Sequence, residues 1–194
     1  IGRLEDALIA YDQVIQKFDR HPLAHLGRAD TLKKLGRLND AVKEYRGCMQ
    51  RMPRLGTVRN GLASALAALG LYDEALDQFP DTAPASFTDW LAYHIRSTIY
   101  LAQGRVQLAE QRLVSGLEEL PWMSLRPMFR TSLAAARIRL RDFYSAAELV
   151  ADVPPGIVWP VAKLIEVHAC GMLNRSSEAA IAYTKLSSSC PTPL

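Results

Sequence analysis

Glycine recurs in this chain at intervals of 34 residues, at Gly2, Gly36, Gly70 and Gly104. Five residues after each glycine stands an alanine, namely Ala7, Ala41, Ala75 and Ala109. A unit of this length is too short to bury an apolar face alone, so several copies must stack on one another. The period therefore predicts a solenoid of small helical units rather than one globular core.

The unit at residues 22–55 shows how each copy is expected to fold. Apolar residues follow the helical period on both sides of Gly36, and glycine suits the left-handed conformation that ends a helix. Ala29 and Ala41 are small enough for two helices to approach closely, while Tyr45 fills the space toward the next unit. The sequence thus predicts a helical hairpin.

With Pro53 stopping the second helix, the order of small residue, Gly, Ala, aromatic residue and Pro resembles the tetratricopeptide repeat family. The units at 56–89 and 90–123 match at the same offsets, whereas the two later units diverge and align with Arg141 and Asn174 in place of the glycine. The resemblance implies an all-α, right-handed superhelical solenoid of antiparallel helix pairs, with about five and a half repeats. The expected boundaries are a half repeat at 1–21, well-matched repeats at 22–55, 56–89 and 90–123, and divergent repeats at 127–159 and 160–193.

Two of the second helices are expected to be short, because Pro80 cuts one and Pro154 with Pro155 cuts another. Both ends of the chain fall out of step with complete repeats, which suggests one array cut from a longer protein. The helix expected at 1–17 has no hairpin partner of its own. Its residues Leu8, Tyr11 and Ile15 are therefore predicted to lack cover and to promote self-association.

In the resembled family, partners bind in the concave groove that the first helices of the repeats line. Carrying the family's groove positions over to this chain selects a set of candidate protein-binding residues. These are Asp30, Lys33, Asn60, Ser64, His94, Thr98, Leu101, Thr131 and Ile138. The set is mostly polar and uncharged beside an apolar strip, and Asn60, His94 and Thr131 are expected to lie off the hairpin core. The resemblance thus implies a protein or peptide partner held in the groove.

The net charge of +3 is too small for a dedicated nucleic-acid binder, so nucleic acid is not the expected partner. One local feature favours a negatively charged partner instead: several arginines stand close together in the segment 126–141. Arg130, Arg137 and Arg139 could bind an anion through their planar guanidinium groups. Alternatively, these arginines pair inside the protein with carboxylates such as Glu110.

Candidate catalytic groups are scattered. His168 and Cys170 come closest to a pair, but residues two apart on a helix point in different directions. The three cysteines have neither disulfide nor metal spacing, so the chain is expected to be a non-enzyme without cofactor or metal in the reducing cytoplasm. No run of 18 apolar residues indicates a membrane span in this segment.

The sequence therefore predicts a non-catalytic protein–protein interaction scaffold. One alternative is a structural or sensor segment of a larger multidomain protein. A weaker alternative is a nucleic-acid or anion binder that uses the arginine cluster.

Overall fold

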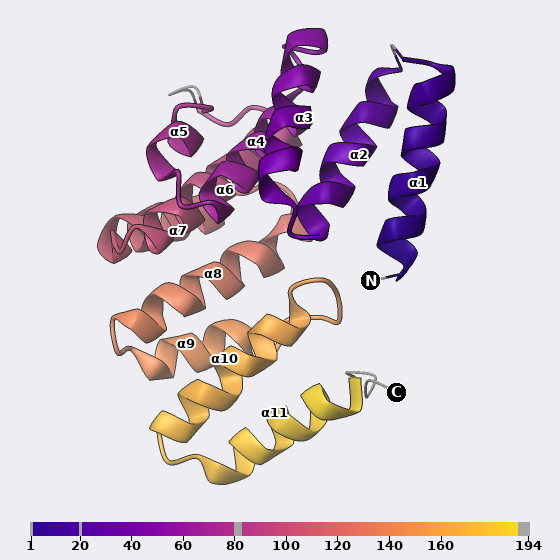
Figure 1. Ribbon diagram of the computed structural model, residues 1–194. Helices are drawn as coiled ribbons and strands as arrows, with labels where there is room; N and C mark the ends of the chain where they lie inside the picture. Colours follow the sequence, from indigo (N-terminus) through magenta and orange to yellow (C-terminus); the bar gives the residue numbers. More distant parts are fainter. Residues whose placement is uncertain (1, 20, 80–82, 190–194) are drawn as a thin grey trace. The chain divides into compact units, whose positions relative to one another are not determined.

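The computed structural model describes residues 2–19, 21–79 and 83–189, and helices make up most of this part of the chain (Figure 1). The helices are α1 (Gly2–Lys17), α2 (Pro22–Lys34), α3 (Leu38–Arg51), α4 (Gly56–Ala68), α5 (Tyr72–Leu76), α6 (Phe87–Ala102), α7 (Val106–Glu119), α8 (Arg126–Arg139), α9 (Phe143–Ala151), α10 (Trp159–Met172) and α11 (Ser176–Ser189). A single 3₁₀ turn, η1 (Met123–Leu125), precedes α8. After α1, first and second helices alternate along the chain; α6 begins three residues before the expected repeat start at 90, and α8 and α10 each begin one residue before the expected starts at 127 and 160.

The same turn closes every hairpin. Gly36, Gly70 and Gly104 have φ of 76°, 79° and 79°, and Arg141 and Asn174 hold the same left-handed conformation with φ of 64° and 58°. The expectation that these two residues take the glycine's place is confirmed.

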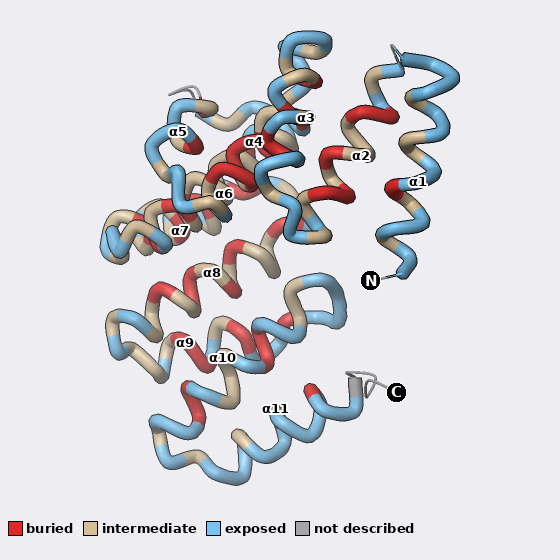
Figure 2. The backbone as a smooth tube through the Cα atoms, in the orientation of Figure 1, coloured by how far each residue is buried: buried red, intermediate tan, exposed pale blue. Residues whose placement is uncertain are grey.

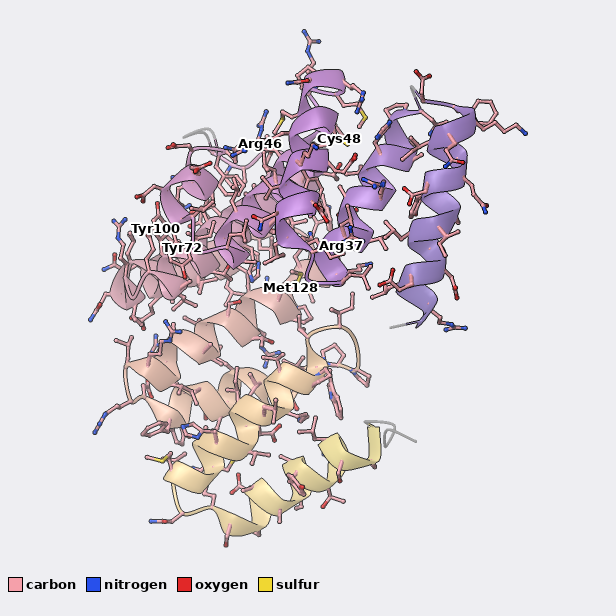
Figure 3. The ribbon with its side chains drawn as sticks, viewed as in Figure 1. Arg37, Arg46, Cys48, Tyr72, Tyr100 and Met128 are labelled. Carbon is pink, nitrogen blue, oxygen red and sulfur yellow. The ribbon has the colours of Figure 1, made fainter. Side chains whose placement is uncertain are left out.

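Backbone hydrogen bonds in these turns also repeat. The residue after the left-handed one donates back to a carbonyl five residues earlier, as Arg37 N does to Leu32 O over 2.9 Å. Asp142 N donates to Arg137 O in the same way, also over 2.9 Å. This pattern is the Schellman motif, which satisfies carbonyls that the end of a helix leaves open. Arg37 is labelled at the α2–α3 turn in Figure 3.

The second helices differ in length as the prolines predict. The second helices α3 and α7 have 14 residues each, whereas α5 has five and α9 has nine. The chain leaves α9 just before Pro154 and Pro155, which lack the amide hydrogen that a continuing helix would need. Pro80, the stop expected after α5, lies outside the described residues.

The chain divides into two compact units, Ile1–Ile99 and Tyr100–Leu194. In the first unit, α1, α2, α3 and α4 pack in succession, and their buried residues form stripes along the inner faces of α2 and α4 (Figure 2). Tyr11 of α1 lies over Gly27 of α2, and Tyr45 of α3 lies over Gly61 of α4. A Cβ atom on either glycine would overlap the tyrosine ring, so these contacts require glycine.

Helix α1 therefore differs from expectation. Leu8 is 6% exposed because it belongs to the core of the first unit, and Tyr11 is half-buried against α2. The expectation that Leu8, Tyr11 and Ile15 lack cover is wrong, since α2 packs on α1 and Ile15 is also half-buried. The large apolar side chains that α1 does expose are Ile9 and Val14, followed by Phe18.

The second unit has a core of small and branched residues from α8, α9 and α10, among them Ala134, Val150 and Ala162. Lys163 is buried in this unit, where its ammonium donates to Ala151 O over 3.2 Å and pairs with Glu166. Because Ala151 is the last residue of α9, the lysine satisfies a carbonyl at the end of that helix. None of the described helices is long and apolar enough to cross a membrane.

Candidate functional site

Two of the residues predicted for the groove are built into the interior of the first unit. Asn60 on α4 is 5% exposed, and its Nδ2 donates to Thr88 O in the first turn of α6 over 3.0 Å. His94 on α6 is also buried. The expectation that these side chains lie off the hairpin core is wrong, because both are buried, and Asn60 is bonded to the first turn of the next first helix.

Hydroxyl groups of the predicted polar strip bond to their own helices. Ser64 Oγ donates to Asn60 O and Thr98 Oγ1 donates to Ile95 O, each over 2.8 Å. In the second unit, Thr131 is buried and its Oγ1 donates to Pro127 O over 2.7 Å. Each of these hydroxyl groups already donates its single proton to a backbone carbonyl of its own helix, so it can only accept a hydrogen bond from a partner.

Asp30 and Lys33 form a small network with the buried Tyr45. The Tyr45 hydroxyl donates to the Asp30 carboxylate, and Lys33 Nζ lies 3.8 Å from Asp30 Oδ1 and 5.6 Å from the centre of the Tyr45 ring. Burial, followed by the hydrogen bond to Asp30, raises the pKa of Tyr45. The network ties α2 to α3, and both charged groups are already partly satisfied within it.

The arginine cluster of the second unit is largely paired inside the protein. Arg137 Nε lies 2.7 Å from Glu110 Oε1, and its Nη1 lies 2.7 Å from Asp142 Oδ2. The hydrogen bond from Arg137 lowers the pKa of Asp142 below its ordinary value. Arg139 Nη1 donates to Leu101 O. The expected pairing with Glu110 is therefore present.

A hollow of about 300 Å³ adjoins Arg130 and Arg137. Glu148 also lines this hollow, and Arg130 Nη2 lies 3.5 Å from Glu148 O. A carboxylate at the rim opposes the binding of an anion there, because like charges repel.

A second hollow, of about 320 Å³, lies between the neighbouring first helices α8 and α10. It is lined by Ala135, Ile138, Arg139, Val161, Leu164, Ile165 and His168. Val161 and Leu164 are more than half exposed, which is unusual for large apolar side chains that stand side by side. Arg139 and His168 supply the polar groups at its edge. This arrangement can take up an apolar side chain.

Of the residues predicted for protein binding, Ile138 lines this hollow, and Leu101 is buried. The α10 residues were missed, although Val161, Leu164 and His168 stand at positions 2, 5 and 9 of the repeat at 160–193. The signal was the same repeat register that selected residues in the earlier units. His168 is exposed while Cys170 is buried, as expected for residues two apart on a helix.

Comparison with solved structures identifies the fold. The chain superposes on a tetratricopeptide repeat protein from Parabacteroides merdae with a TM-score of 0.78 and 15% identity, over 98% of this chain and 74% of that one. It superposes on TTC0263, a tetratricopeptide repeat protein of Thermus thermophilus, with a TM-score of 0.68 and 20% identity, over 89% and 92% of the two chains. The chain thus has the tetratricopeptide repeat fold.

A third similar structure is the Cut9–Hcn1 hetero-tetramer of APC/C, with a TM-score of 0.76 and 15% identity. The match covers 93% of this chain and 36% of that one, so the chain spans about a third of its length. No family model and no curated protein matches the sequence.

Proposed function

We propose that the chain is a non-catalytic binding module that holds a partner peptide or partner domain, with the hollow between α8 and α10 as an anchor site. The observation that carries this proposal is the pair of exposed leucine and valine side chains, Leu164 and Val161, at the mouth of an apolar hollow. Apolar clefts with a few polar groups at the edge are typical of binding sites.

The hollow sets the kind of residue that would enter it. Ile138, Val161 and Leu164 offer apolar contact, which favours an aliphatic or aromatic side chain of the partner. Full burial of such a side chain contributes about 1.5–3 kcal/mol. One anchor of this size supports weak binding, so a specific partner must also contact neighbouring first-helix surface.

A similar structure gives this proposal support by analogy. YrrB, with 15% identity and a TM-score of 0.52, is described as a tetratricopeptide repeat protein with an unusual peptide-binding site. The anion-binding alternative has less support, because Arg137 is already held between two carboxylates and Glu148 faces the adjoining hollow.

The test is a selection of displayed random peptides on the intact 194-residue chain, followed by affinity measurement on the selected peptides. We expect the peptides to share one aliphatic or aromatic residue and to bind at least about tenfold more weakly to Leu164→Asp, because a charge cannot be buried in the hollow without a partner. Ile157→Asp is the matched control, since Ile157 lies in the loop before α10 and is fully exposed. Equal binding to wild type and Leu164→Asp would show that the peptides bind elsewhere.

A further inference from the structure

The hollow between α8 and α10 combines an apolar lining with two planar polar groups at its edge. Arg139 of α8 and His168 of α10 are these groups, and Ala135, Ile138 and Leu164 are among the apolar residues that line it. Both helices belong to complete hairpins, because α9 packs on α8 and α10, and α11 packs on α10. The hollow therefore lies between two first helices that each have their second helix in place.

Contacts with neighbouring helices position both planar groups. Arg139 Nη1 donates to Leu101 O in the last turn of α6. The His168 ring packs edge-on against Phe143 of α9, with 6.0 Å between the ring centres and 72° between the ring planes. Because these groups are already oriented, a contact with a partner costs less conformational entropy.

Arg139 gives this edge a positive charge. None of the described residues that line the hollow carries a carboxylate, in contrast to the hollow that Glu148 lines. A positive edge attracts either a carboxylate or the face of an aromatic ring, which is negative because of its π electrons. The chain itself contains the second kind of contact, since the Arg175 guanidinium lies 5.3 Å from the centre of the Tyr144 ring.

The size and lining of the hollow favour the ring over the carboxylate. The volume of the hollow is about 320 Å³. This is roughly twice the volume of the engineered protein cavity, about 150 Å³, that binds benzene. A ring of the partner therefore fits and covers the apolar side chains of Ile138 and Leu164. A carboxylate would leave these side chains in contact with water, and an aliphatic side chain would offer Arg139 no negative face.

We propose that the hollow holds an aromatic side chain of the partner, with the ring packed against the planar groups of Arg139 and His168. This inference rests on the proposed function, because it specifies the anchor residue at the same site. It makes Arg139 the residue that distinguishes an aromatic anchor from an aliphatic anchor of similar size.

The probe is a fluorescent synthetic copy of one displayed peptide that binds wild type and loses affinity on Leu164→Asp. Alanine scanning identifies its anchor residue, which is then replaced in turn by phenylalanine, cyclohexylalanine, leucine and glutamate. Cyclohexylalanine has nearly the size of phenylalanine but no π electrons. Each peptide is titrated against the intact 194-residue chain and followed by fluorescence anisotropy.

We expect the phenylalanine peptide to bind about two- to fivefold more tightly than the cyclohexylalanine peptide, because a cation over a ring face contributes about that factor. Arg139→Gln should remove this difference and leave the affinity of the leucine peptide unchanged, which shows that the hollow is intact. Arg141→Gln is the matched control, since Arg141 is an exposed arginine two residues further along that does not line the hollow. This control should preserve the difference.

Three results would overturn the inference. Equal or tighter binding of the cyclohexylalanine peptide would mean that the hollow selects by apolar area alone. A preference for phenylalanine that persists in Arg139→Gln would mean that another group contacts the ring. Tightest binding of the glutamate peptide would mean that the edge binds an anion. The first two results leave the proposed function standing. If instead no displayed peptide loses affinity on Leu164→Asp, the proposed function fails and this inference fails with it.

Discussion

Arg141 holds a left-handed backbone conformation at the turn between α8 and α9, at a position where three other turns of the chain have glycine. A residue with a Cβ atom in this conformation costs about 1–2 kcal/mol. Glycine avoids that cost but loses about 0.5–1 kcal/mol more conformational entropy on folding. The difference predicts that Arg141→Gly stabilises the second unit by about 0.5–1 kcal/mol.

The assay must report on the second unit alone, because two compact units need not unfold in one transition. Native-state hydrogen exchange of peptides from α8, α9 and α10 gives the local free energy of opening. Arg141→Gly should raise that free energy and leave the values for α2 and α3 unchanged.

Two control variants separate backbone strain from the loss of the arginine side chain. Arg141→Ala removes the same exposed side chain but keeps the Cβ atom, so it should give no gain. Asn174→Gly should give a smaller gain, because asparagine tolerates the left-handed conformation better than other residues with a Cβ atom. If Arg141→Ala stabilises the unit as much as Arg141→Gly, the strain argument is refuted.

Three further outcomes follow from other contacts. Gly61→Ala should lower the free energy of unfolding by about 1–3 kcal/mol, because the added methyl group overlaps the ring of Tyr45. Gly47→Ala should raise it by about 0.5–1 kcal/mol, because the added methyl group meets only the flexible end of an arginine side chain. Urea denaturation compares the two variants. Cys48, on α3 in Figure 3, is buried, and burial raises its pKa to about 11. Alkylation of Cys48 at about pH 8, followed by mass spectrometry, should therefore need unfolding of the first unit. Rapid alkylation of the native protein would contradict the packing. Asp142→Asn should destabilise the second unit at neutral pH, because the hydrogen bond from Arg137 favours the charged carboxylate. Since the pKa of Asp142 is lowered in the folded protein, this stability is present above about pH 4 and is lost as the pH falls through the folded-state pKa. Urea titrations of wild type and Asp142→Asn should therefore converge in acid.

The turns and hairpins could be predicted from the sequence because they depend on local features. A left-handed residue at each turn fixes where the first helix ends; the interval is 34 residues between successive glycines from Gly36 to Gly104, and the same turn forms at Arg141 and Asn174, where the spacing changes to 37 and 33 residues. Prolines likewise limited α9 to nine residues. In each case the determining residue lies within a few positions of the feature it determines.

The burial of the candidate groove could not be predicted in the same way. Whether Asn60 faces a partner or the next repeat depends on how closely α4 and α6 approach, and repeat position alone does not specify that distance. The approach brings the amide within hydrogen-bond reach of the Thr88 carbonyl and closes the site to solvent. Similarly, α2 covers Leu8, because a second helix such as α1 also packs on the first helix that follows it.

These contacts change the expected chemistry of partner binding in the second unit. Arg137 is paired with two carboxylates, and the Thr131 hydroxyl donates its proton to a backbone carbonyl of its own helix. Exposed apolar side chains remain instead, at Val161 and Leu164 on α10 and at Tyr183 on α11. Recognition through such groups depends on area buried and on shape, and ionic screening acts weakly on it. A partner bound at the hollow between α8 and α10 should therefore lose little affinity as salt is raised, and its affinity should follow the size of the apolar side chain that it places there.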